Sequence, residues 1–220
     1  MTRVLPYCAF LHRNDVLLPA TGVNGGALHV LHEGELQVLW SEVEWPFQPA
    51  AVQQNAVEFH HVVTRVFFQT AVMPFRLLAV FDNEQALATL VSERQADFVN
   101  DLQGLQNFVQ MECVIFSKPS KPDPASGKAY LLGKAELLNS ARDYIQSVKN
   151  SPGNLITAIR TRELKSGSRI FVLVERGQEK QFRSAVEEIP VPAGMTRRIS
   201  GPWPAAEFLS DSVKMPQERS

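Results

Sequence analysis

The chain has few cysteines and no long uncharged apolar run. Among its 220 residues there are 2 cysteines, Cys8 and Cys113, and both lie within apolar stretches. Cysteines in such places usually pack as small buried hydrophobes, so we expect no disulfide framework. A membrane-spanning helix needs about 18 or more consecutive apolar residues. Arg65 and Arg76 interrupt the most apolar region, 57–81, so no membrane span is expected.

The chain also lacks an excess of either charge. It carries 22 Lys and Arg against 23 Asp and Glu, a formal net charge of -1. A near-neutral chain has no electrostatic reason to bind a phosphate backbone or an anionic membrane. A secretory signal layout is missing, because the first apolar stretch is broken by Pro6 and followed by the polar residues 12–15. We therefore predict a cytoplasmic protein with neither nucleic acid nor membrane as partner.

The five histidines do not have the spacing of a metal or acid/base site. His60 and His61 are adjacent on a predicted helix, so their side chains project about 100° apart and cannot chelate one ion together. His29 and His32 differ by an odd number in a predicted strand and lie on opposite faces. We predict no catalytic, cofactor-binding or metal-binding residues. An enzyme that uses His60 or His61 with a nearby carboxylate is the weakest alternative.

What the chain does contain is an ordinary globular composition, with 45% apolar and 20% charged residues. A chain of this length can bury one sizeable core, or it can form two small domains of roughly 100 residues each. The domain count must therefore come from the pattern along the chain.

The first half is predicted to form strands around amphipathic helices. The stretch 4–11 is apolar at both odd and even positions, which is typical of a central strand covered on both faces. Two runs, 27–32 and 35–43, flank Glu33-Gly34 and predict a hairpin. Pro49 opens a helix in which apolar residues recur at three- and four-residue steps. A strand at 72–81, a helix capped by Asp82-Asn83 and running to about 102, and a strand at 108–116 follow.

A proline-rich polar stretch, 118–126, divides the chain. Such a composition resists both helix and central strand, so we predict a linker between domains 1–117 and 127–220. The second domain is predicted to hold a helix at 131–148, a hairpin of 155–164 with 170–175, a helix at 178–189 and a strand at 195–199. Strands clustered around helices without regular βαβ alternation predict two α+β domains.

Arg65 and Arg76 stand in the most apolar region of the chain. Burial of an unpaired guanidinium is costly, so the first interpretation is a core arginine paired with a carboxylate or carbonyl. The alternative is that Arg76 lies at a partner-binding surface. The sequence leaves both open.

Four short segments are notable for their order along the chain. They are Glu33–Leu36, the stretch Ala-Val-Met-Pro-Phe-Arg at 71–76, Ser-Gly-Lys-Ala-Tyr-Leu at 126–131, and Gly-Pro-Trp-Pro-Ala-Ala-Glu-Phe at 201–208. In the same order they resemble the early hairpin, the VLP-x-R-FGT-x-F stretch, the sG-x-aYL helix start and the closing GPWPPYSF of the gas vesicle protein F and L family. Leu-Leu-Ala at 77–79 replaces the family's Phe-Gly-Thr.

The resemblance implies an N-terminal mixed α+β sheet domain and a C-terminal ferredoxin-like α+β domain. It further implies a non-enzymatic accessory or minor structural protein of gas vesicle assembly, located in the cytoplasm at the gas vesicle. Such a protein would bind the vesicle shell protein during nucleation or growth, together with other accessory proteins and without a cofactor. We place the possible contact near Met73, Phe75 and Arg76. The alternative is a ligand- or protein-binding module of the same fold unrelated to vesicles.

Overall fold

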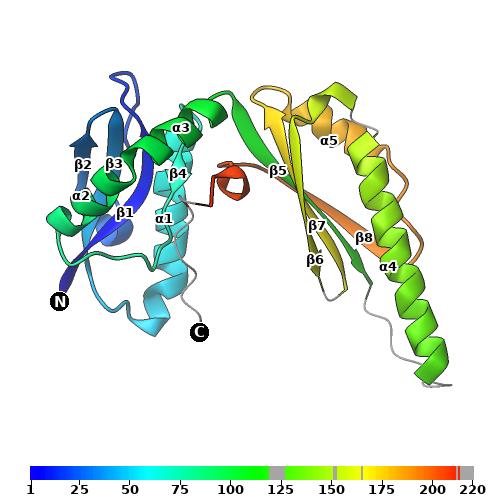
Figure 1. Ribbon diagram of the computed structural model, residues 1–220. Coiled ribbons are helices and arrows are strands. Elements are labelled where there is room, and N and C mark those ends of the chain that lie inside the picture. The colour runs from blue at the N-terminus through cyan, green and yellow to red at the C-terminus, as the bar shows by residue number, and fades with distance from the viewer. Residues whose placement is uncertain (119–126, 151–152, 165, 212, 214–220) are drawn as a thin grey trace. The chain divides into compact units, whose positions relative to one another are not determined.

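The computed structural model describes residues 1–118, 127–150, 153–164, 166–211 and 213, with the backbone alone for 127–134. Contacts divide the chain into two compact units (Figure 1), Met1–Asn107 with Pro204–Ser220 and Phe108–Trp203. Each unit combines helices with one four-stranded antiparallel sheet. The predicted α+β class with two sheets is confirmed.

The sheet of the first unit has the strand order β2-β3-β1-β4. Its strands are β1 (Thr2–Leu11), β2 (Leu28–Glu33), β3 (Leu36–Glu44) and β4 (Met73–Pro74). Within β1 every residue from Val4 to Phe10 is buried. Helices explain this burial, because Tyr7 meets Phe59 of α1 on one face while Ala9 joins the core cluster of α2 and α3 on the other. The predicted central strand and the β2-β3 hairpin are confirmed.

Three helices cover this sheet: α1 (Val52–Phe67), α2 (Glu84–Glu93) and α3 (Gln95–Leu105). The predicted cap of α2 is present, since the Asn83 side chain accepts a hydrogen bond from the Ala86 amide at 2.9 Å. The predicted single helix is in fact two, because the backbone at Arg94 is non-helical (φ -116, ψ 11). The buried residues Leu87, Val91, Phe98 and Leu102 fit one continuous helical face as well as two. The apolar pattern therefore contains no signal for the break.

The strand predicted at 72–81 is much shorter in the structure. Met73 and Pro74 pair with β1, and a separate bridge joins Phe81 to Val4. Between these points the chain turns away from the sheet, with the Ala79 amide bonded to the Arg76 carbonyl at 2.9 Å. Pro74 has no N–H to give to a ladder, which shortens the pairing.

The second unit follows the chain order β5-α4-β6-β7-α5-β8, and its sheet has the order β6-β7-β5-β8. The elements are β5 (Phe108–Ser117), α4 (Gly127–Asn150), β6 (Ala158–Leu164), β7 (Gly167–Glu175), α5 (Glu179–Glu187) and β8 (Met195–Trp203). Both helices pack on one face of the sheet, over the buried side chains of Met111, Cys113 and Ile115. This matches the helices and strands predicted for the second half.

The division of the chain differs from the predicted domains 1–117 and 127–220. Strand β5 pairs with β7 and β8, so it lies in the second unit. After β8 the chain returns to the first unit, where Leu209 and Val213 are buried in the core. Ser210 fixes this return, because its amide and hydroxyl both donate to the Asp101 carboxylate at 2.8 and 2.9 Å. The predicted linker 118–126 lies outside the described residues, apart from Lys118.

The closing Gly-Pro-Trp segment forms the end of β8 rather than a turn after it. The strand runs beyond the predicted end at 199 to Trp203, which pairs with Gln110. Gly201 has φ +114, and an added Cβ would lie 2.9 Å from both the Gln110 carbonyl oxygen and the Met111 sulfur. Glycine is required here for both its conformation and its lack of a side chain.

We expect Gly201→Ala to lower the free energy of unfolding by about 2 kcal/mol or more, because alanine adds strain at positive φ and a backbone overlap. Gly104→Ala is the matched control, since Gly104 lies in α3 and an added Cβ there has open space. That change should stabilise the helix by about 0.5–1 kcal/mol. Urea denaturation of both variants measures the difference, and equal midpoints would contradict this account of Gly201.

Candidate functional site

The segment predicted to touch a partner is divided between the core and the surface. Met73 and Phe75 are 4% and 6% exposed and pack in the core cluster that includes Leu87 and Phe98. Arg76 is exposed, and Leu78, in the turn that follows, is 64% exposed. The structure therefore brings Met73 and Phe75 together as an anchor and presents Arg76 with Leu78 to solvent.

The interpretation of Arg65 and Arg76 as buried core arginines is wrong. Both side chains are exposed. Arg65 lies on α1, whose buried face is formed by Asn55, Phe59, Val62, Val63, Val66 and Phe67. An apolar region in sequence therefore does not become an apolar environment for every residue in it, because each helix has a solvent side.

The histidines do not form a catalytic or metal centre among the described residues. His60 and His61 are exposed, and the Thr64 hydroxyl lies 3.3 Å from Nε2 of His60. The Glu58 carboxylate accepts hydrogen bonds from the Gln54 side chain and the Asn24 backbone amide, and these lower the pKa of its carboxyl. In the part of the chain that the structure describes, no three His, Cys, Asp or Glu side chains are placed to hold a metal ion.

Both cysteines are free and fully buried, as predicted. Burial raises the pKa of the Cys113 thiol to about 11 and also raises that of Cys8. The Tyr144 hydroxyl lies 4.0 Å from the Cys113 sulfur. Both thiols therefore stay protonated and unreactive near neutral pH, as small core residues.

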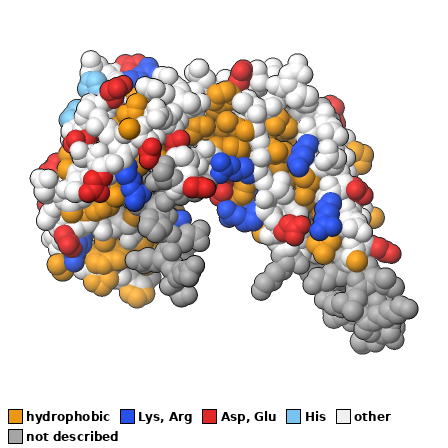
Figure 2. All heavy atoms as spheres, viewed as in Figure 1, with side chains coloured by type: hydrophobic (Ala, Val, Ile, Leu, Met, Phe, Trp, Pro, Cys, Tyr) orange, Lys and Arg blue, Asp and Glu red, His pale blue; other side chains and the backbone are white. Residues whose placement is uncertain are grey.

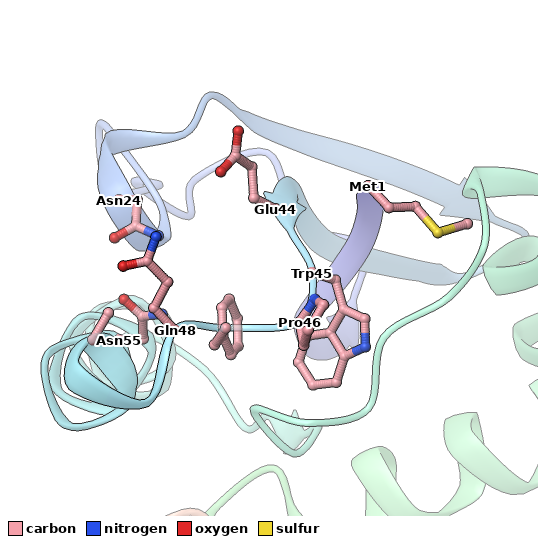
Figure 3. A pocket seen from close by; sticks show the side chains of 9 residues that line it. Met1, Asn24, Glu44, Trp45, Pro46, Gln48 and Asn55 are labelled. Carbon is pink, nitrogen blue, oxygen red and sulfur yellow. The ribbon is translucent and has the colours of Figure 1, made fainter.

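A cavity of about 380 Å³ lies between the end of β3 and the start of α1 (Figure 3). Asn24, Gln48 and Asn55 lie on one side of it and Trp45 with Pro46 on the other, as the close view shows. Asn55 is 1% exposed, and neither atom of its side-chain amide has a hydrogen-bond partner among the described residues. Glu44 is the one ionisable side chain in the lining. The cavity is polar but contains no nucleophile and no acid/base pair.

The second unit has an unusual concentration of arginine on the sheet face opposite its helices. Arg160 and Arg162 of β6 alternate with Ile159 and Thr161, and Arg169 of β7 is paired with Arg162. Arg198 projects from β8 two strands away. The sequence prediction missed this group. Its signal was the Arg-Thr-Arg alternation in a strand, which becomes informative once the face is known.

Neither thiol should react with an aqueous disulfide reagent at about pH 8 while the protein is folded, because burial blocks both access and ionisation. Both should react once the chain is unfolded in guanidinium chloride. The absorbance of the released thiolate counts the modified groups. Rapid labelling of the native protein would contradict the burial of Cys8 and Cys113.

Asn55→Leu should raise the free energy of unfolding by about 1 kcal/mol, because it replaces a buried amide without partners by an apolar group of similar size. Gln53→Leu, at an exposed position of the same helix, is the control and should change stability by less than about 0.5 kcal/mol. Urea denaturation measures both. A clear loss of stability in Asn55→Leu would show that the amide is satisfied.

Among the described residues, no helix has the length and apolar character needed to cross a bilayer. No curated protein sequence matches the chain. Two crystal structures share the fold across both units. Gas vesicle protein GvpF from Anabaena sp. PCC7120 matches with a TM-score of 0.78 at 15% identity, covering 100% of this chain and 99% of that one. GvpF from Microcystis aeruginosa matches with a TM-score of 0.74 at 13% identity, covering 94% and 99%.

The family model described as gas vesicle synthesis protein GvpL/GvpF matches residues 4–210. This match spans the strands and helices of both units, including the segment around Met73 and the closing Gly-Pro-Trp. It agrees with the prediction of a non-catalytic protein, because this is a family of gas vesicle assembly. The chain belongs to the gas vesicle synthesis protein GvpL/GvpF family.

Proposed function

We propose that this protein is a non-enzymatic accessory or minor structural protein of gas vesicle assembly that binds the vesicle shell protein during nucleation or growth. The observation that carries the proposal is the family match over residues 4–210, supported by a fold shared over the whole chain with GvpF. The setting is the cytoplasm at the growing vesicle, with other accessory proteins as further partners.

The role has a physical rationale in the properties of a gas-enclosing shell. Such a shell needs subunits with extended apolar surface, and exposed apolar surface aggregates unless a partner covers it. A partner need not perform chemistry to do this. It needs a rigid surface that carries apolar side chains in contact with water.

The turn at Arg76 and Leu78 has these properties, and we propose it as the shell contact. Met73 and Phe75 hold the base of the turn in the core, so the exposed part starts from a fixed position. Leu78 is 64% exposed and supplies apolar area, while Arg76 supplies charge and hydrogen-bond donors. Interfaces favour this combination of an apolar anchor with arginine.

The second unit also supports a finer description of the fold. Its chain order β-α-β-β-α-β and the sheet order β6-β7-β5-β8 agree with the ferredoxin-like arrangement. We therefore propose the ferredoxin-like label for the second unit.

One observation favours the alternative of a ligand-binding module, namely the cavity of about 380 Å³ with the unsatisfied amide of Asn55. A small polar ligand could satisfy that amide. The alternative and the assembly role predict different outcomes in the experiment below, because a ligand-binding module has no reason to retain the shell protein.

The test is co-expression of the tagged chain with the shell protein, followed by affinity capture and quantification of the retained shell protein. Arg76→Ala with Leu78→Ala should reduce the retained amount about tenfold, which corresponds to about 1.4 kcal/mol of binding free energy. The control is Arg65→Ala with Val57→Ala, which removes one exposed arginine and one exposed aliphatic side chain from α1. The control should retain shell protein as the unaltered chain does.

If the unaltered chain retains no shell protein and its deletion leaves vesicle formation unchanged, the assembly role is rejected. If the unaltered chain retains shell protein and both double variants do so equally, the role stands and the Arg76 contact is rejected. Thermal unfolding of each variant should match that of the unaltered protein, because all four positions are exposed.

A further inference from the structure

The sheet of the second unit has one covered face and one face that its own described helices leave open. On β5 the side chains of Met111, Cys113 and Ile115 lie under α4 and α5. Residues at the alternate positions, Glu112 and Val114, therefore lie on the open face. Residues that pair directly across neighbouring strands lie on the same face, so the pairing identifies the open-face residues of β6, β7 and β8 as well.

One row of residues on the open face crosses all four strands. Arg162 of β6 pairs with Arg169 of β7, Arg169 pairs with Val114 of β5, and Val114 pairs with Arg198 of β8. The adjacent row is Arg160, Phe171, Glu112 and Ser200. We call Arg160, Arg162, Arg169 and Arg198 the arginine face. Figure 2 shows Lys and Arg side chains lying among hydrophobic ones over the strands of this unit.

Two of the four guanidinium groups lie over an aromatic ring. The Arg162 and Arg169 groups lie 5.4 and 6.0 Å from the centre of the Phe171 ring, which is itself only 4% exposed. Arg169 also contacts the Glu112 carboxylate at 3.3 Å. Stacking over an aromatic face favours a guanidinium and restricts its orientation. The arginine face is thus partly preorganised.

Positive charge is concentrated in these two rows. Like charges directly opposite each other on neighbouring strands destabilise a sheet, and Arg162 stands opposite Arg169. The two rows contain four guanidinium groups and one carboxylate, in a chain whose net charge is -1. The concentration of positive charge is therefore local, and added carboxylates would relieve the repulsion through paired hydrogen bonds.

Nucleic acid is a poor match for this surface. Sheets that bind single strands stack the bases on exposed aromatic rings. Here the Phe171 ring is 4% exposed and lies beneath the guanidinium groups, so no base can reach its face. The near-neutral net charge also gives a long polyanion little general attraction. A short segment with a few carboxylates fits better.

We propose that the arginine face binds an acidic segment of a partner protein. Arg160 and Arg162 are two residues apart on one strand, so their Cα atoms are about 7 Å apart. Carboxylates at alternate positions of an extended segment have the same spacing and would pair with them. Arg169 and Arg198 extend the site across the sheet. This site lies in a different unit from the proposed shell contact at Arg76, and neither depends on the other.

The test uses the full chain and a labelled peptide of about ten residues that alternates Glu with Thr, long enough to cross the sheet. Fluorescence anisotropy measures its binding, beside the matched Gln-Thr peptide and a ten-nucleotide thymidine strand. The Glu-Thr peptide should bind at least about tenfold more tightly than the other two probes. Raising the salt from about 0.05 to about 0.5 M should weaken its binding strongly.

Arg160→Gln with Arg162→Gln should reduce affinity for the Glu-Thr peptide about tenfold or more and flatten its salt dependence. Lys149→Gln with Lys180→Gln is the control, because it removes two exposed positive charges from α4 and α5 on the helical side. The control should bind within about twofold of the unaltered chain. Thermal unfolding of each variant verifies that it is folded at the temperature of the binding measurement.

Several results would overturn the proposal. Equal binding of the Glu-Thr and Gln-Thr peptides would show that charge is not recognised. An arginine variant that binds as the unaltered chain does, or a lysine control that loses as much affinity, would place the binding elsewhere. Tighter binding of the thymidine strand, lost in the arginine variant, would assign the face to nucleic acid. Because these probes contain no vesicle protein, failure here leaves the proposed assembly role untouched.

Discussion

The second unit depends on the antiparallel pairing of β5 with β7 and β8. These three strands hold Met111, Cys113 and Ile115 under the helices, and the same register aligns Arg162, Arg169 and Arg198 on the reverse side. Because successive side chains of a strand point to opposite faces, the register that places one set in the core also places the other set on the reverse face. A one-residue slip would bring arginine into the core, so the packing of the core also determines the composition of the open face.

The sheet of the first unit is covered differently, because its strand β1 is buried on both faces. Helix α1 covers one side, and α2 with α3 covers the other. The segment after α1 adds Met73 and Phe75 to this core, and it then turns outward at Arg76 and Leu78. A buried base with an exposed tip gives a surface group a fixed position, which lowers the entropy cost of binding.

The two units therefore offer surfaces of different chemistry. The turn of the first unit combines an aliphatic side chain with one arginine, whereas the second unit presents several arginines over a covered aromatic ring. Both are surfaces of the kind that proteins use to bind other proteins, and neither requires catalysis.

Local patterns in the sequence were sufficient for much of the fold. A continuous apolar run predicted β1, and the Glu33-Gly34 turn predicted the β2-β3 hairpin. Helical spacing predicted α1, period-two spacing predicted β5, and the Asn83 cap of α2 follows from the residues that form it. Four short segments resemble the gas vesicle family in their order along the chain, and the family model matches residues 4–210. These features depend on neighbouring residues, so the sequence by itself determines them.

The tertiary structure decided the strand pairings and the burial of side chains that depend on residues far apart in the sequence. It placed β5 with strands far along the chain, returned Leu209 to the first unit, buried Met73 and Phe75, and exposed Arg65 and Arg76. It also assembled the arginine face from three strands. The physical reason is that periodicity shows that an element has two faces, whereas the packing of other elements decides which face meets water.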